Sequence, residues 1–284
     1  MEAVKGSIQL MRLVNGFMAA VGVLVGALAS GLLYHPLFTT IAMLSTFFTA
    51  TSGYILNDWK DVEIDMINCP ERAIPSGRVS RNTALVLAIT FMIAGDIIIW
   101  FTNFETILIV MIASVLIASY SLWFKKMGFI GNVIVGILTG FCLLVGGASV
   151  GHIELAIFPT LLAFSLNVGR EIMKGIDDYI GDKAEGAKTL AVRWGRKKAA
   201  GVGVVFLSIT VVISPLPYII YNSYYNILYL ILALIADGIL IVDSVLILKT
   251  PTSEMGHQVK RTIKFAAFIG LLAFLLGLRG VILP

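Results

Sequence analysis

Long apolar stretches, separated by short polar segments, follow one another along almost the whole chain. A helix that crosses the hydrocarbon core of a bilayer needs about 20 mainly apolar residues. By this criterion the pattern predicts nine membrane spans, at residues 10–33, 37–56, 82–102, 104–124, 129–150, 153–173, 199–220, 225–248 and 262–283. We therefore expect an all-α polytopic membrane protein whose nine transmembrane helices surround a central cavity.

The composition agrees with a membrane protein. Apolar residues make up 58% of the 284 residues and charged residues only 13%, and the mean hydropathy is +0.93. Soluble domains carry about 25% charged residues, so most of this chain would lack a surface suited to water. Since charges are costly in lipid, the few charged residues should be confined to loops and to a functional site.

The basic residues predict the orientation of the spans. If the N-terminus is cytoplasmic, 20 of the 21 Lys and Arg residues fall in or beside cytoplasmic segments, and only Arg279 does not. This bias is typical of cytoplasmic loops, so we predict a multi-pass protein of the cell membrane with its N-terminus and active-site loops in the cytoplasm. The same bias explains the net charge of +4 without a nucleic-acid partner. Cys69 lies in a predicted loop and Cys142 in a span, which argues against a disulfide.

Two of the predicted cytoplasmic loops are long, at residues 57–81 and 170–198. Loops of such length in a compact protein are usually functional. Each loop follows an even-numbered span, and four spans separate the two loops. The arrangement predicts a single transmembrane domain over residues 1–284, with a four-helix pseudo-repeat (spans one to four and five to eight) and a ninth helix.

The first long loop begins with an acidic segment, NDWKDVEID, at residues 57–65. Asn57, Asp61 and Asp65 are four residues apart, and Asp58 precedes Asp61 by three. On a helix that continues from the second span, these side chains share one face, where like charges repel. A divalent cation is the simplest compensation, and oxygen ligands favour Mg²⁺. The alternative interpretation is a solvated acidic helix end that binds nothing.

The second acidic segment, REIMKGIDDYIGDKAEGAKTL, starts at Arg170. Glu171, Lys174, Asp178 and Asp182 share one face of a helix in this segment. The spacing alone is weak evidence, because charged amphipathic helices produce it by chance. The position is stronger evidence, since both acidic segments lie on one side of the membrane at equivalent points of the two predicted halves. We expect the two clusters to face each other across a cavity.

Opposed acidic clusters beside basic residues suit the binding of a diphosphate. Mg²⁺ can bridge carboxylates to phosphate oxygens, while Lys and Arg hold the remaining oxygens. Neutralising a leaving diphosphate lowers the barrier to breaking an allylic C–O bond. The apolar spans would house an isoprenoid tail and exclude water. The sequence therefore predicts a Mg²⁺-dependent membrane enzyme that transfers a prenyl group from a prenyl diphosphate.

These segments resemble the motifs of the UbiA-type intramembrane prenyltransferase superfamily, and the resemblance covers essentially the whole chain. It is most specific at NDxxDxxxD over residues 57–65, which Arg72 and Pro-Ser-Gly at 75–77 follow. The second motif is DxxxD at 178–182. Within the superfamily, the form REIxKxIDDxxGD…GxKTL is most similar to archaeal digeranylgeranylglyceryl phosphate synthases.

The resemblance implies roles for individual residues. It implies a Mg²⁺–diphosphate site made by Asn57, Asp58, Asp61, Asp65, Asp178 and Asp182, of which Asp61, Asp65, Asp178 and Asp182 are the catalytic residues. Substrate contacts are implied for Asn15, Arg72, Tyr120, Lys125 and Lys174. The implied reaction joins geranylgeranyl diphosphate to the hydroxyl of geranylgeranylglyceryl phosphate and forms the second ether bond of archaeal membrane lipids. The hydroxyl proton would pass to an acidic side chain or to a diphosphate oxygen.

Three alternatives stay open at this point. The same chemistry could act on an aromatic or tetrapyrrole acceptor in place of a lipid acceptor. A phosphotransferase of the CDP-alcohol type would need a DGxxAR…GxxxD pattern, which the sequence lacks. A transporter would place its acidic residues near the bilayer midplane, whereas these lie at the cytoplasmic ends of predicted spans. The expected partners are the prenyl diphosphate, the acceptor and the bilayer, with no obligate protein partner evident.

Overall fold

Helices make up nearly all of the protein in a computed structural model, which describes residues 2–30, 36–184, 186–221, 223 and 225–278. The long helices of this described part are α2 (Leu13–Ala29), α3 (Pro36–Lys60), α5 (Arg81–Ile98), α6 (Phe104–Leu122), α7 (Phe129–Ser149), α8 (Ile153–Asp177), α11 (Arg196–Ile213), α13 (Ile227–Lys249) and α14 (Ser253–Leu276). The short helices are α1 (Glu2–Met11), α4 (Val62–Asn68), α9 (Tyr179–Ala184), α10 (Leu190–Trp194) and α12 (Leu216–Ile220), with 3₁₀ turns η1 (Ile99–Phe101) and η2 (Phe124–Met127). The all-α prediction is confirmed.

Each of the predicted spans overlaps one of the long helices, although residues 31–33 and 279–283 of the predicted spans lie outside the described residues. In the described part, seven helical stretches are long and apolar enough to cross a membrane, and α3 and α14 are not among them. In α3 the reason is a series of hydroxyl side chains, such as Ser45 and Ser52. Ser45 donates a hydrogen bond to the Gly95 carbonyl at 2.8 Å, and Ser52 donates one to the Ala88 carbonyl at 2.7 Å. The count of nine spans stays a prediction.

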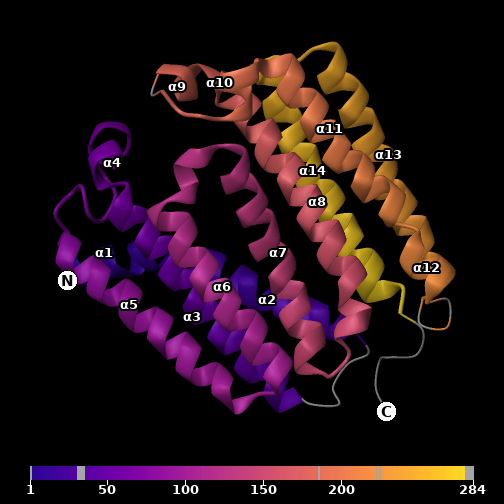
Figure 1. Cartoon of the computed structure of the whole chain (residues 1–284), viewed down its shortest axis with the longest axis horizontal. Coiled ribbons are helices and arrows are strands. Elements are labelled where there is room, and N and C mark those ends of the chain that lie inside the picture. Colours follow the sequence, from indigo (N-terminus) through magenta and orange to yellow (C-terminus); the bar gives the residue numbers. More distant parts are fainter. Residues whose placement is uncertain (1, 31–35, 185, 222, 224, 279–284) are drawn as a thin grey trace.

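The helices form two groups that meet at α7 and α8 (Figure 1). The first group contains α2, α3, α5 and α6, and the second contains α8, α11, α13 and α14. Helix α7 packs on both α2 and α8 and so joins the two groups. A Cβ added at Gly26 or Gly146 would overlap backbone atoms of the facing helix, so α2 and α7 can approach this closely only with glycine at these positions.

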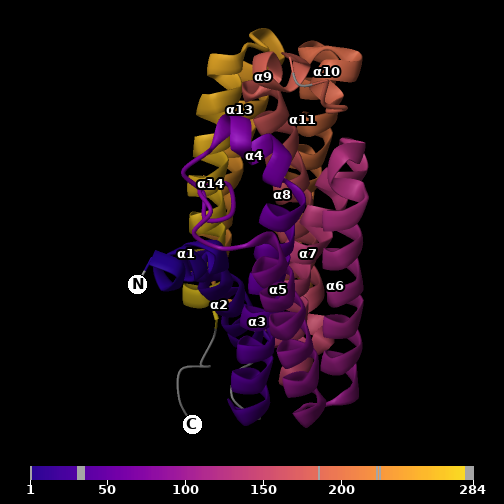
Figure 2. The same ribbon diagram turned by 90° about the vertical axis from the view of Figure 1, so that its left-hand side faces the viewer.

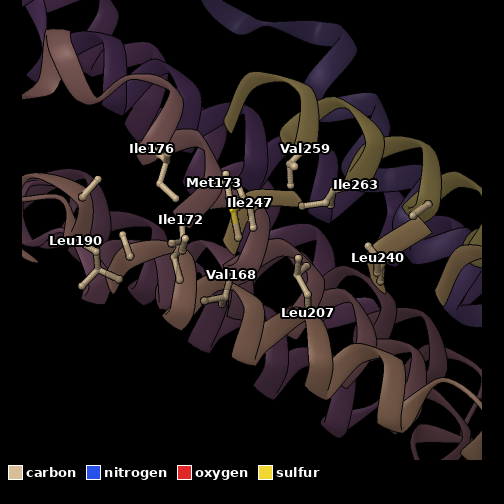
Figure 3. Close-up of a cluster of buried hydrophobic side chains, with 14 of the residues drawn as sticks. Val168, Ile172, Met173, Ile176, Leu190, Leu207, Leu240, Ile247, Val259 and Ile263 are labelled. Carbon is tan, nitrogen blue, oxygen red and sulfur yellow. The ribbon is translucent and has the colours of Figure 1, made fainter. Parts of the chain in front are cut away.

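The largest buried cluster lies in the second group (Figure 3). It joins Ile172 and Met173 of α8 to Leu207 of α11, Leu240 of α13 and Ile263 of α14. The outer surfaces of the helices are also apolar, with Trp100, Val115 and Val212 among the large exposed side chains. Such a surface suits lipid, and with the apolar helical stretches it identifies a multi-pass membrane protein.

The short helices mark the two ends of the bundle. In Figure 1, α4, α9 and α10 lie at the upper end, while α12 lies at the opposite end. Helices α4 and α9 follow directly on α3 and α8, so both acidic segments lie at one end, as the sequence predicts. In Figure 2, α1 leaves the bundle at an angle to α2. The chain turns there at Arg12, which has φ 45° and is the only non-glycine residue with positive φ in the described part. Cys69 and Cys142 are free, in agreement with the prediction.

Candidate active site

The first acidic segment runs from the end of α3 into α4. The helix breaks at Asp61, with φ −90° and ψ 5°, but helical hydrogen bonds continue across the break. The Asp61 amide donates to the Asn57 carbonyl at 3.0 Å, and the Asp65 amide donates to the Asp61 carbonyl at 2.8 Å. These residues therefore share one face across the break, as the four-residue spacing predicts.

Basic side chains pair with each aspartate of this segment. Arg12 donates to Asp58 at 2.6 Å, Arg72 contacts both oxygens of Asp65 at 2.8 Å, and Lys125 pairs with Asp61. Arg72 also lies 3.8 Å from Asp58. Basic residues from the turn between α1 and α2, the loop after α4 and η2 therefore compensate part of the like charge of this segment, and the divalent cation that the sequence led us to expect stays a prediction.

Burial adds to the electrostatics of the first segment. It raises the pKa of Asp58, and the charges of Arg12 and Arg72 offset this only in part. For Arg72 burial alone lowers the pKa, but the hydrogen bond and charge of Asp65 raise the pKa overall. A half-buried cation held by carboxylates is therefore charged at every physiological pH and suits the binding of a phosphate oxygen.

The second acidic segment has the same backbone geometry as the first. Helix α8 ends where Asp178, with φ −79° and ψ 5°, separates it from α9. The Asp178 amide donates to the Lys174 carbonyl at 2.9 Å, and the Asp182 amide donates to the Asp178 carbonyl at 2.9 Å. Asp178 is exposed, Asp182 is half-buried, and Lys174 lies 4.0 Å from Glu171 one turn before the break.

The residues on either side of Asp178, Asp177 and Tyr179, make contacts that hold the second segment against the other helices. Asp177 pairs with Lys260 of α14 and lies 3.2 Å from His257 of the same helix. The guanidinium of Arg196 lies 4.9 Å from the centre of the Tyr179 ring, within the range of a cation–π contact. The sequence pattern does not predict this pairing of Asp177 with His257, because it joins positions 80 residues apart.

The connection between α6 and α7 touches both acidic segments. Lys125 of η2 pairs with Asp61 of the first segment. Three residues later, Gly128 has φ 61°, and a Cβ there would overlap the carbonyl oxygen of Lys188 in the loop after α9. Only glycine fits at this position, both for its positive φ and for the close backbone contact. The structure thus brings the two predicted segments and Lys125 into one region.

The other predicted substrate contacts lie around this region. The Tyr120 ring of α6 packs near Gly131 of α7, and its hydroxyl lies within electrostatic reach of both Glu171 and Asp61. Lys174 is exposed on α8. Asn15 lies on an exposed face of α2, three residues after Arg12, and its substrate contact stays a prediction.

The donor set of the first segment fits a hard metal ion. Asn57 contributes a buried side-chain oxygen that has no hydrogen-bond partner, an oxygen suited to act as a ligand. Carboxylate and amide oxygens are the ligands that Mg²⁺ takes. Among the described residues, however, no three His, Cys, Asp or Glu side chains lie close enough to hold a metal. The metal site therefore stays a prediction.

Comparison with known proteins matches residues 17–269 to the UbiA prenyltransferase family. Digeranylgeranylglyceryl phosphate synthase of Thermococcus kodakarensis is 38% identical over 274 residues, which cover 96% of this chain and 98% of the relative. The synthase of Saccharolobus solfataricus is 36% identical over 280 residues, covering 97% of each chain.

Solved structures show the same fold. A digeranylgeranylglyceryl phosphate synthase structure matches with a TM-score of 0.88 and 34% identity, covering 98% of this chain and 99% of that chain. A UbiA homolog from Archaeoglobus fulgidus, bound to DMAPP and Mg²⁺, matches with a TM-score of 0.72 over 94% of this chain and 98% of its own. The latter is 17% identical and shares the fold alone.

Proposed function

Because the chain belongs to the UbiA prenyltransferase family, we propose that it transfers a geranylgeranyl group from geranylgeranyl diphosphate to geranylgeranylglyceryl phosphate. The product carries the second ether bond of archaeal membrane lipids. The observation that carries the proposal is the pair of acidic segments with matching backbone breaks at Asp61 and Asp178, at one end of an apolar bundle. Similarity over nearly the full length to relatives that bear this synthase name favours the lipid acceptor.

In this proposal Mg²⁺ and the donor diphosphate lie between the two segments. Oxygen atoms from both would hold the ion, namely those of Asn57, Asp58, Asp61, Asp65, Asp178 and Asp182. When bound, Mg²⁺ supplies neutralisation of the charge that develops on the diphosphate as the C1–O bond breaks. Arg72, Lys125 and Lys174 would contact the remaining phosphate oxygens and add to that neutralisation.

Apolar and aromatic side chains between the acidic segments and the far end of the bundle would bind the prenyl group of the substrate. The isoprenoid tail would lie among the apolar helices, where water is excluded from the allylic cation. The Tyr120 ring, close to both halves, would face that cation with its π electrons. The acceptor hydroxyl would attack C1 of the prenyl group, so that the ether C–O bond forms as the bond to diphosphate is lost.

We place this end of the bundle in the cytoplasm. The basic residues around α4, α9 and α10 support that orientation through the charge bias of cytoplasmic loops. The equivalent geometry at Asp61 and Asp178 supports a pseudo-repeat, in which α2, α3, α5 and α6 correspond to α7, α8, α11 and α13.

The test is turnover of the purified protein with Mg²⁺, geranylgeranyl diphosphate and geranylgeranylglyceryl phosphate, with and without a chelator. We expect formation of the doubly prenylated ether, and its loss when the chelator removes the metal. Turnover with an aromatic or tetrapyrrole acceptor alone would keep the chemistry but overturn the proposed acceptor. Absence of diphosphate release with every acceptor would overturn prenyl transfer itself.

A further inference from the structure

One carboxylate of the second acidic segment has no part in the proposed metal site or in diphosphate binding. Glu171 lies on α8 two turns before Asp178 and on the same helical face. It is 17% exposed, receives a hydrogen bond from Arg170 at 3.0 Å and lies 4.0 Å from Lys174. Arg170 in turn lies 3.4 Å from the side-chain oxygen of Asn167. A buried charge held in this way is costly to maintain and is usually functional in a membrane protein.

Glu171 lies further from the end of the bundle than Asp178 does, on the same helix. Seven residues of α helix separate it from Asp178, which places it about 10 Å further into the bundle. A diphosphate held at the end of the bundle, with its tail among the apolar helices, must point C1 in this direction. Glu171 therefore lies on the side of the proposed diphosphate site where the prenyl group would enter the bundle.

We propose that Glu171 is the proton acceptor for the hydroxyl of the acceptor lipid. This inference rests on the proposed function and deepens it. As the oxygen lone pair of the hydroxyl forms the new bond to C1, the C1–O bond breaks and its electron pair leaves with the diphosphate. The proton of the hydroxyl passes to a carboxylate oxygen of Glu171, so charge and atoms balance without another reactant.

Arg170 makes this chemistry feasible as a positioning residue. Its guanidinium donates a hydrogen bond to the Glu171 carboxylate at 3.0 Å and fixes its direction. The hydroxyl becomes more acidic as its oxygen bonds to C1, so a carboxylate in hydrogen-bond reach takes the proton in that transition state. The proposed function assigns Asp58, Asp61 and Asp65 to Mg²⁺ binding and leaves Glu171 without a role there.

The test compares Glu171→Gln with the wild type in the same assay with the same two substrates. Gln keeps an oxygen for Arg170 but cannot take the proton, so we expect kcat to fall about 100-fold or more. The KM of both substrates should stay within about threefold, because the lost interaction belongs to the transition state. Glu154→Gln is the matched control, since Glu154 lies in the first turn of the same helix at its far end, and it should turn over as the wild type does.

A second variant separates proton transfer from a structural role. Glu171→Ala leaves space beside Arg170, and added formate should restore part of the lost rate by supplying the missing carboxylate. Stabilisation of each variant against heat by the donor and Mg²⁺ checks that it is folded and binds. A kcat of Glu171→Gln close to that of an active wild type, or a formate effect equal in Glu171→Ala and wild type, would overturn the inference. A wild type that forms no product would overturn the proposed function, and this inference with it.

Discussion

The two acidic segments share a backbone but differ in how their carboxylates are held. At Asp61 and at Asp178 the helix breaks with nearly the same φ and ψ, and helical hydrogen bonds bridge both breaks. In the first segment each aspartate has a basic partner, and Asp58 and Asp65 are buried. In the second segment Asp178 is exposed. The contacts that hold this segment are made by its neighbours, since Asp177 pairs with Lys260 and the Tyr179 ring contacts Arg196.

This difference indicates that the two segments are preorganised in different ways for the same metal–diphosphate ligand. The first segment has its carboxylates already oriented by cations, so little rearrangement is needed before they bind a metal. The second segment has its backbone held at α14 and α11, while Asp178 is exposed and Asp182 half-buried. We expect the first segment to set the place of the diphosphate and the second to complete the site around it.

The largest effect should come from removing a central carboxylate in either segment. We expect Asp61→Ala and Asp178→Ala each to lower kcat by about 1000-fold or more, because each removes a ligand that holds the diphosphate in the transition state. Steady-state turnover at saturating Mg²⁺ measures both. Near-normal turnover of both variants would contradict the metal-site proposal, and loss in one alone would show that a single segment holds the diphosphate.

A smaller effect is expected at Lys125, where the two segments meet. Lys125→Met removes the partner of Asp61 and a proposed phosphate contact, so kcat/KM should fall by about 100-fold. Lys249→Met is a matched control, since Lys249 is exposed at the end of α13. Equal activity of the two variants would exclude Lys125 from the site.

Arg12 tests the preorganisation of the first segment. Arg12→Ala leaves the buried Asp58 with only the more distant Arg72 as a cation. Since an uncompensated buried carboxylate distorts its surroundings, we expect the Mg²⁺ concentration for half-maximal rate to change by about tenfold, with a smaller change in kcat. Titration of the rate with Mg²⁺ measures this. An unchanged Mg²⁺ dependence would show that the cation does not order the segment.

The smallest effect is expected at Asp177, which fastens the second segment from outside. Asp177→Asn weakens its pairs with Lys260 and His257, and partly exposed ion pairs contribute about 0–1 kcal/mol each. We expect a loss of a few-fold in kcat/KM and a slightly lower melting temperature. His257→Ala should change both less than Asp177→Asn does. A loss as large as that of Asp178→Ala would instead place Asp177 inside the site.

The sequence by itself determined the helices and the position of the acidic segments. Long apolar stretches fix where helices form in lipid, because every backbone polar group must be bonded within its own segment. The four-residue spacing fixes the shared face of Asn57, Asp61 and Asp65. An even number of helices between the segments fixes that both lie at one end of the bundle. These are local properties, and the structure confirms them.

Only the tertiary structure decided which charges meet. Arg12 and Asp58 are 46 residues apart, and Lys125 and Asp61 are 64 residues apart, so no local pattern pairs them. The same holds for Asp96, which accepts a hydrogen bond from Ser114 at 2.6 Å. Such pairs depend on how helices pack and rotate against one another, which the apolar pattern leaves open because lipid-facing and helix-facing positions are both apolar. The sequence thus determined the elements, and packing determined the site.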